Sequence, residues 1–368
     1  MKKLGFGLMR LPQTDPDDWS AVDTALTRQM IDRFLAEGFT YFDTAYVYHH
    51  GMSEKAFGEL VAKRYPRTAY TITTKMPVFI TKTMEDYERI FDEQLERCGV
   101  EYFDNYFLHS LGKSYYPDVQ RLGGFEFMAR KKAEGKIRHI GFSFHDDAET
   151  LEQILTDHPE TELVQLQINY IDWENESIQS RKCYEVCVKH GVPVAVMEPL
   201  KGGALANPPQ AAAELLSEHN PHLSMASWGI RYAASLENVI VVLSGMSTPD
   251  QLEDNVSYMK EFQPLSEAEQ QAVAKTVQII NDSIAIPCTG CRYCIENCPQ
   301  KIAIPEFFAL YNDYEQYGLQ GGTMTTYGNL ILTHGKASDC INCKQCEEHC
   351  PQHLHITDNL KRVAEVFK

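Results

Sequence analysis

Two groups of residues in this 368-residue chain have types and spacings that suit chemistry. The first group is an acid, a phenol, a lysine and a histidine: Asp43, Tyr48, Lys75 and His109. A lysine ammonium favours the phenolate, so it would lower the pKa of Tyr48 from about 10 and let the phenol exchange protons near neutral pH. Asp43 would pair with Lys75 and fix its position, and His109 would orient a carbonyl oxygen. By itself, the stretch 41–54 also fits a surface turn with a solvated Asp and packed tyrosines.

The second group is formed by eight of the eleven cysteines, which follow one another in two runs of the pattern C-x2-C-x2-C-x3-C-P. In this iron–sulfur spacing, three thiolates of a run hold one cluster and the fourth cysteine ligates the other cluster. A zinc site needs only four ligands and has no use for a doubled run. The pattern therefore predicts two [4Fe-4S] clusters, and the module resembles the ferredoxin family. The expected ligands are Cys288, Cys291, Cys294, Cys298, Cys340, Cys343, Cys346 and Cys350.

The first group must be positioned by the elements that precede it in the chain. Short apolar and β-branched runs alternate with segments of helical periodicity, and the later runs lack polar alternation, as parallel strands buried on both faces do. Such alternation predicts an α/β fold, a (β/α)8 TIM barrel, in which chemistry lies at the carboxyl ends of the strands. An open doubly wound sheet is the alternative, but Gly5-Phe6-Gly7 lacks the third glycine of its phosphate turn. Strands are expected at 4–9, 39–42, 70–74, 102–108, 139–144, 163–169, 193–199 and 239–243.

The uneven distribution of cysteine marks a domain boundary near residues 280–287. We expect the barrel over residues 1–264, a connecting helix and linker over 265–286, and a ferredoxin-like domain over 287–368. The stretch between the two cysteine runs is long for a compact bacterial ferredoxin and begins with a helical pattern after Ile304. The second domain is therefore predicted to be small and mostly helical.

Composition excludes several classes of partner. The net charge is −17 and no stripe of Lys and Arg occurs, so we expect no nucleic-acid partner. No run reaches the roughly 18 apolar residues of a membrane helix, so we expect no membrane partner. Arg10 and Pro12 interrupt the start before a signal-peptide core could form, which predicts a cytoplasmic protein. In that compartment, clustered cysteines favour metal binding over disulfides.

The barrel segment resembles the aldo/keto reductase family over about residues 3–264. The resemblance implies that Asp43, Tyr48, Lys75 and His109 form the catalytic tetrad of that family, with all four residue types intact. The motifs that carry it are FDTA-x-x-Y at 42–48, TTK at 73–75, YFLH at 106–109, GFSFH at 141–145, QINY at 167–170 and MEPLKGG at 197–203.

The resemblance also implies a nicotinamide cofactor, NADH or NADPH. Ser143 and Gln167 would hold its carboxamide, and Met197 would pack on the ring, where the family often has an aromatic residue. The loop 198–203 and the loop 244–255 would hold the pyrophosphate and the adenosine. The second loop lacks the usual Lys or Arg for a 2′-phosphate, so NADH should bind at least as well as NADPH. The further cofactor contacts expected are Pro199, Leu200, Lys201, Ser244, Gly245, Gln251, Asp254 and Asn255.

The resulting hypothesis is an iron–sulfur oxidoreductase, from an anaerobic metabolism, that reduces a small carbonyl substrate or oxidises an alcohol. Hydride carries two electrons together whereas a cluster carries one, so coupling them needs a carrier of both kinds, such as a flavin. Three arrangements stay open: structural clusters, clusters that serve a redox partner protein, and clusters that feed a flavin or the substrate. The alternative is an electron-transfer protein whose barrel only binds and docks, or a flavin-mediated one-electron reductase whose barrel does not use a nicotinamide. Such a barrel would not need the Lys75–Tyr48 pair.

Overall fold

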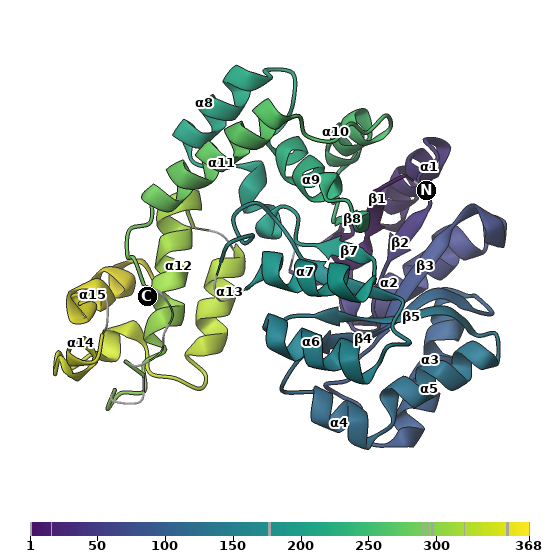
Figure 1. Ribbon diagram of the computed structural model, residues 1–368, viewed down its shortest axis with the longest axis horizontal. Helices are drawn as coiled ribbons and strands as arrows, with labels where there is room; N and C mark the ends of the chain where they lie inside the picture. Colours follow the sequence, from purple (N-terminus) through teal and green to yellow (C-terminus); the bar gives the residue numbers. More distant parts are fainter. Residues whose placement is uncertain are drawn as a thin grey trace. The chain divides into compact units, whose positions relative to one another are not determined.

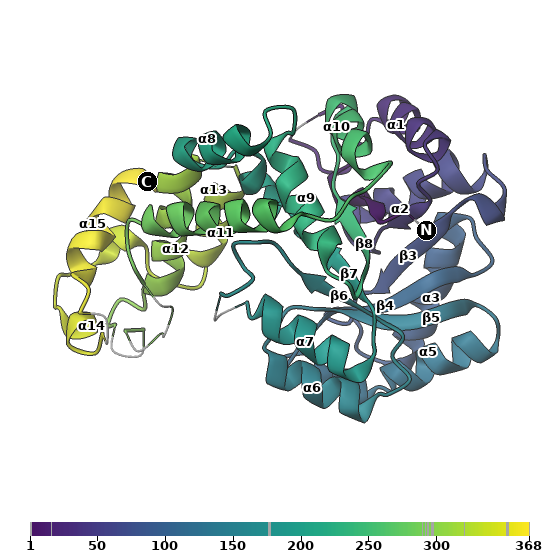
Figure 2. The ribbon, with the colours of Figure 1, turned by 45° about the horizontal axis from the view of Figure 1, so that its top comes forward.

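Eight parallel strands close into a barrel in which each strand pairs with the next along the chain and β8 pairs with β1. The computed structural model describes residues 2–15, 17–175, 178–288, 290, 292, 294–295, 298–319, 321–350 and 353–367. Helices surround the strands in both ribbon views (Figures 1 and 2), which confirms the predicted (β/α)8 barrel. The strands are β1 Leu4–Gly7, β2 Tyr41–Asp43, β3 Thr71–Met76, β4 Phe103–Leu111, β5 Ile137–Phe144, β6 Leu163–Gln167, β7 Val194–Met197 and β8 Val239–Ser244.

The chain separates into two compact units. Unit 1 comprises Met1–Ala206 and Leu223–Gln270 and contains the barrel, and unit 2 comprises Asn207–His222 and Gln271–Lys368. The helices that begin in unit 1 are α1 Thr24–Ala36, α2 Met52–Phe57, α3 Met84–Cys98, α4 Tyr116–Arg121, α5 Gly124–Ala133, α6 Ala148–Asp157, α7 Ser180–His190, α9 Met225–Ser235, α10 Pro249–Met259 and α11 Glu267–Asp282.

Several helices begin where a short polar side chain accepts a hydrogen bond from a free backbone N–H group. Asp23 accepts from Leu26 N before α1, and Thr83 forms a reciprocal capping box with Asp86 before α3. Thr248 caps α10, whose first residue is a proline. These caps fix the lengths of the loops that follow the strands.

A small cluster of buried side chains inside the barrel comes from the even-numbered strands, with Ala195 added from β7. Its members from the even-numbered strands are 7% exposed or less: Tyr41, Phe107, Leu163, Val241 and Leu243. Layers from alternate strands are the usual packing of such a barrel. Gly141 on β5 permits a close approach to β6, because a methyl group there would lie 2.0 Å from Leu163 O. The dense interior gives the strand ends fixed positions.

Several predicted strand boundaries differ from the structure by a few residues. The first strand ends at Gly7, and residues Leu8–Arg10 form a 3-10 helix. The strands predicted at 163–169 and 193–199 end at Gln167 and Met197. Leu8 is buried in the 3-10 helix, as a residue of a central strand would be. An apolar pattern alone therefore cannot show where the strand stops.

The regular secondary structure in the described residues of unit 2 is helical, apart from a single parallel bridge between Ile302 and Gly335, and irregular segments connect the helices. This confirms the mostly helical ferredoxin-like region. The segment 265–286 contains α11, and its predicted boundaries with the neighbouring domains stay a prediction. In the part of the chain that the structure describes, no helix has the length and apolar character needed to cross a membrane. The helices are α8 Gln210–His219, α12 Ile304–Tyr317, α13 Gly321–Leu330, α14 Gln345–Glu348 and α15 Ile356–Val366.

Candidate functional site

Three neighbouring strands bring the acid, the lysine and the histidine to one rim of the barrel. Asp43 is the last residue of β2, Lys75 lies one residue before the end of β3, and His109 lies near the end of β4. Tyr48 begins a short 3-10 turn that follows β2. Because the carboxyl ends of parallel strands share an edge, four residues that are distant in sequence become neighbours.

Lys75 and Asp43 form a buried ion pair. Their Nζ and Oδ1 atoms are 2.6 Å apart, and the side chains are 1% and 4% exposed. The ammonium also donates to Thr44 O at 2.8 Å. Burial alone would lower the pKa of Lys75, but the charge of Asp43 raises it above its ordinary value. The lysine is therefore a fixed cation at neutral pH.

Tyr48 lies beside this cation. Lys75 Nζ is 5.1 Å from the centroid of the Tyr48 ring, and the ring meets His109 edge-to-face at 5.8 Å. The predicted fall in the pKa of Tyr48 is wrong: burial of its hydroxyl raises the pKa, and Lys75 opposes this only in part. Asp43 cancels much of the effect of Lys75, because an ion pair presents little net charge to the phenol.

His109 is 8% exposed, and its Nδ1 atom is buried without a hydrogen-bond partner among the described residues. Burial and the charge of Lys75 hold the pKa of this imidazole well below its ordinary value. The ring is therefore neutral at pH 7. A neutral imidazole can donate one hydrogen bond to an oxygen without adding a second cation to the site.

A buried polar network that the sequence did not reveal lies behind Lys75. Glu54 is fully buried, and its Oε1 atom accepts from Thr74 Oγ1 and from Gln94 Nε2, each at 2.7 Å. Gln94 Nε2 also donates to Lys75 O at 3.0 Å. Burial raises the pKa of Glu54 to about 7, against hydrogen bonds and Arg97 that lower it. The network holds the backbone from which Lys75 projects. In the sequence Glu54 is an acid in the first turn of a helix, a common position for a solvated acid, and only its burial distinguishes it.

The two residues expected at a nicotinamide carboxamide lie on β5 and β6. Ser143 Oγ accepts from Ser110 N at 2.8 Å, which leaves its hydroxyl proton available. Gln167 Nε2 donates to Asp172 Oδ2 at 2.8 Å, which leaves its carbonyl oxygen available. Met197 is half-buried at the end of β7. Their contacts with a cofactor stay a prediction.

Asp172 is a second residue that sequence reasoning missed. It is 0% exposed, accepts from Gln167 and Asn169, and pairs with Lys201 Nζ at 3.0 Å through Oδ1. Lys201, expected at the pyrophosphate, is thus already held by an acid. No local pattern marks Asp172; its importance comes from the side chains that converge on it.

The loop 198–203 is shaped by unusual backbone angles. Glu198 and Lys201 have φ of 55° and 48°, and Gly202 and Gly203 also have positive φ. The Glu198 carboxylate turns back to accept from Gly202 N. Pro199 and Leu200 complete the turn, so the predicted loop residues do lie together.

The residues predicted after β8 surround one loop and the start of α10. Ser244 Oγ accepts from Asn255 Nδ2, and Gln251 Oε1 accepts from Ser247 N, both at 2.7 Å. Asp254 accepts from Ser224 Oγ at 2.7 Å. Gly245 lies against the side chain of Arg10, which comes from the segment after β1. Arg10 was not among the predicted site residues.

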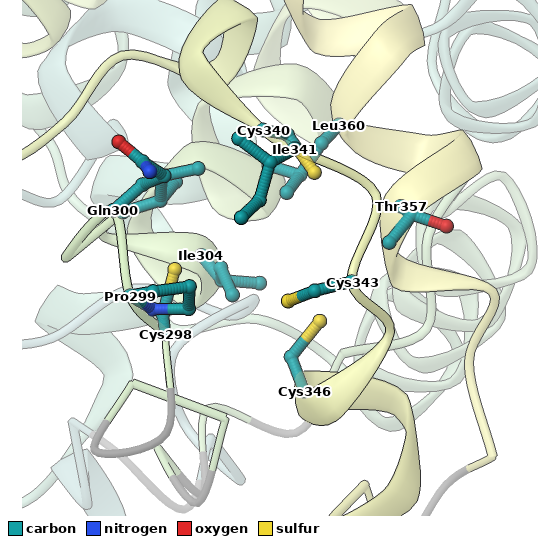
Figure 3. A pocket seen from close by; sticks show the side chains of 11 residues that line it. Cys298, Pro299, Gln300, Ile304, Cys340, Ile341, Cys343, Cys346, Thr357 and Leu360 are labelled. Atoms are coloured by element: carbon teal, nitrogen blue, oxygen red, sulfur yellow. The ribbon is translucent and has the colours of Figure 1, made fainter.

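In unit 2, the fourth cysteine of the first run lies with three cysteines of the second run. Cys298, Cys340, Cys343 and Cys346 line one cavity, and Figure 3 shows their side chains around a common space. Ile302, Ile304 and Leu360 complete an apolar lining. Among the described residues, no three His, Cys, Asp or Glu side chains could hold a single metal ion. Four thiols around a space, rather than around a point, suit a cubane better than a lone zinc ion.

The other predicted ligand set is described only in part. Cys294 and Cys350 are buried and Cys288 is half-buried, whereas Cys291 lies outside the described residues. Ligation of iron by all eight cysteines stays a prediction.

Comparisons with known proteins identify both parts of the chain. The profile of the aldo/keto reductase family matches residues 3–278, and the profile of the 4Fe-4S dicluster domain matches residues 287–356. The chain is 26% identical over 239 residues to a 9,11-endoperoxide prostaglandin H2 reductase of Trypanosoma cruzi, covering 61% of this chain and 76% of that protein. It is 28% identical over 274 residues to an uncharacterized oxidoreductase of Schizosaccharomyces pombe, covering 70% and 81%.

Solved structures show the same fold. An aldo-keto reductase from Klebsiella pneumoniae in complex with NADPH has a TM-score of 0.59 at 20% identity, covering 74% of this chain and 90% of that chain. The holo form of an aldo-keto reductase from Bacillus halodurans has a TM-score of 0.59 at 23% identity, covering 74% and 91%.

Proposed function

The chain belongs to the aldo/keto reductase family, and from this premise we propose that its barrel transfers hydride between a nicotinamide cofactor and a small carbonyl or alcohol. The protein is an oxidoreductase with a 4Fe-4S dicluster domain. The observation that carries the proposal is the buried Lys75–Asp43 pair beneath the ring of Tyr48. Burying two charges carries a desolvation cost that their mutual attraction has to offset. A cation held beside a phenol suits proton transfer.

Tyr48 is the proposed proton donor. Its raised pKa keeps the proton on the phenol at neutral pH, so Tyr48 is neutral and holds the proton that the reaction requires. As the proton passes to the carbonyl oxygen, negative charge develops on the phenol oxygen, and the nearby Lys75 ammonium stabilises that charge. Asp43 holds Lys75 in place. In alcohol oxidation, the same oxygen would take the proton back.

His109 is proposed to orient the substrate oxygen. Its ring is neutral and can donate one hydrogen bond, and its edge-to-face contact with Tyr48 at 5.8 Å places the imidazole beside the phenol. Phe79 packs against the same imidazole at 5.5 Å and limits its rotation. Together, the phenol and the imidazole fix the direction from which the carbonyl carbon can be attacked.

The residues present fit a nicotinamide carboxamide. A bound nicotinamide would supply the hydride. A carboxamide presents one carbonyl oxygen and one NH2 group, and Ser143 has a proton to donate while Gln167 has an oxygen to accept. Asp172 can only accept when ionised, so it requires the NH2 group of Gln167 to face it and turns the oxygen outward.

The cysteine module is proposed to hold two [4Fe-4S] clusters with crossed ligation. Cys340, Cys343 and Cys346 with Cys298 would hold one, and Cys288, Cys291 and Cys294 with Cys350 the other. The clusters would move single electrons, to or from a redox partner protein or a flavin, because hydride itself moves as a pair.

The test is the variant Tyr48→Phe in anaerobically prepared protein, assayed with NADH and NADPH against a panel of small aldehydes and ketones. Loss of the general acid should lower the rate about 10²–10⁴-fold while nucleotide binding is retained. Tyr46→Phe is the matched control, because its hydroxyl donates to Glu93 at 2.7 Å and not to the tetrad. Undiminished turnover in Tyr48→Phe would remove Tyr48 as the acid. It would favour the alternative, an electron-transfer protein whose barrel only docks.

A further inference from the structure

His145 is a second imidazole at the barrel rim that carries the tetrad, and the proposed reaction does not use it. Phe107 on β4 belongs to the cluster inside the barrel, whereas Phe142 and Phe144 on β5 belong to the larger core that includes helix residues. Because side chains alternate along a strand, Ser143 and the next odd residue, His145, face the inside of the barrel. His145 therefore lies on the same side of β5 as the polar residue expected at the cofactor.

The electrostatics of the rim agree with this placement. Burial, and then the charge of Lys75, lower the pKa of His145 below its ordinary value. His145 in turn adds to the effects of burial and of Lys75 that lower the pKa of His109. Charges act on one another in this way only at short range, so the three side chains are neighbours. His145 is neutral at pH 7, and like His109 it can donate one hydrogen bond.

The loops after β4 and β5 are bonded to each other and hold His145 in place. Its backbone N donates to Leu111 O at 3.4 Å, and Lys113 N donates to Asp146 Oδ2 at 2.7 Å. A methyl group placed on Gly112 would lie 2.9 Å from the same carboxylate oxygen, so the two loops are in close contact. The fold thus fixes the backbone on both sides of the imidazole.

The ring of His145 is available to a ligand. Its side chain is exposed to solvent although protein surrounds it on most sides, as expected for a group in a hollow. Among the residues that the structure describes, no hydrogen bond or ion pair reaches the ring. His145 also lines one cavity with Gln167, which is proposed to hold the nicotinamide carboxamide. The ring therefore neighbours both the tetrad and the proposed place of the nicotinamide, where a substrate has to lie.

The charges around His145 favour an uncharged group of the substrate. Asp146 lines the same cavity, and Lys75, the cation that acts on His145, is already paired with Asp43. A substrate carboxylate here would lose its water without gaining an unpaired cation, which is costly. A hydroxyl or carbonyl oxygen can instead accept a hydrogen bond from the neutral imidazole.

We propose that His145 donates a hydrogen bond to an uncharged oxygen on the carbon next to the reacting carbonyl. Neighbouring strands lie about 4.8 Å apart, so imidazoles at the ends of β4 and β5 can reach oxygens on adjacent carbon atoms. His109 and Tyr48 hold the carbonyl oxygen, and His145 holds the second oxygen. The substrate class is therefore 2-hydroxy carbonyls and 1,2-dicarbonyls. This inference rests on the proposed reduction of a carbonyl and names its substrate class.

The experiment measures kcat/KM of anaerobic, cluster-containing protein with saturating nucleotide for 2-butanone, 3-hydroxy-2-butanone and 2,3-butanedione. These ketones differ only in the oxygen on the neighbouring carbon. In His145→Leu, kcat/KM for the two vicinal compounds should fall about tenfold, because one hydrogen bond is lost, and kcat/KM for 2-butanone should not change. His145→Gln keeps a donor and should restore most of the loss. His139→Leu is the matched control, because this histidine of β5 is 57% exposed and contacts Glu162, so no ketone should be affected.

The outcomes separate the inference from the function on which it rests. Equal falls for all three ketones, or no fall for any, would overturn the role of His145 and leave the proposed function standing. A wild type that prefers 2-oxobutanoate, and loses this preference in His145→Leu, would overturn the uncharged oxygen in favour of a carboxylate. A wild type that reduces none of the ketones with NADH or NADPH would overturn the proposed function together with the inference.

Discussion

Glu54 makes the stability of the barrel depend on pH in a way that can be calculated. Its carboxyl group is fully buried between Thr74 and Gln94, and burial raises its pKa from 4.5 to about 7. The protonated form is therefore favoured in the folded protein more than in the unfolded chain. The folded state binds more protons over this range, so the free energy of unfolding falls as pH rises from about 4.5 to about 7 and stays low above it.

The magnitude follows from the difference between the two pKa values. That difference is about 2.5 pH units, and each unit corresponds to 1.36 kcal/mol, so the full effect is on the order of 3 kcal/mol. Between pH 5 and pH 8, titration of this one group should lower the free energy of unfolding by roughly 2–3 kcal/mol. Solvent screening does not reduce this figure, because the side chain has no exposed surface.

The assay compares wild type with Glu54→Gln by urea unfolding under anaerobic conditions at pH 5, 6, 7 and 8. The fully buried Trp228 on α9 gives a fluorescence signal from the barrel. Glu54→Gln can be less stable at every pH, because Gln donates toward Arg97, but its stability should fall roughly 2–3 kcal/mol less between pH 5 and pH 8. Other groups, such as the buried His109, titrate in both proteins and cancel in the difference.

Glu59→Gln serves as the control. Glu59 follows α2 closely in the chain, but its side chain is 62% exposed and pairs with an exposed lysine. This variant should keep the pH dependence of the wild type. Equal pH dependence in wild type and Glu54→Gln would refute the reasoning, since it would mean that Glu54 is ionised in the folded protein across the whole range.

Two further predictions concern the cysteine module and the carboxamide site. Anaerobic protein should contain about eight irons per chain, as two cubanes require. The variant Cys298→Ser should alter the electron paramagnetic resonance signal of the cluster held by Cys340, Cys343 and Cys346. A change confined to the cluster of the first run would show that ligation is not crossed. Asp172→Asn leaves Lys201 without its buried partner and allows the side-chain amide of Gln167 to flip. The KM for nucleotide should therefore rise about tenfold, while kcat at saturating nucleotide changes little. An equal fall in kcat would instead give Asp172 a role in the chemical step.

Much of the architecture could be predicted from the sequence because the relevant signals are local. The apolar runs that became β7 and β8 carry no polar alternation, and a strand buried on both faces requires this. The order of strands then followed from chain order, so Asp43, Lys75 and His109 could be placed on one rim without coordinates. The cysteine spacing is local as well, because three ligands of one cluster come from a single short run.

Only the tertiary structure determined the pKa shifts of the site residues and their ion-pair partners. From sequence, Lys75 should have lowered the pKa of Tyr48; in the fold, burial and Asp43 reverse that shift. Asp172 and Lys201 are polar residues of ordinary appearance until the loops after β6 and β7 bring them within 3.0 Å. Desolvation and charge pairing depend on distances in space, and a residue such as Arg10, near the start of the chain, meets Gly202 only because the barrel closes β1 against β8.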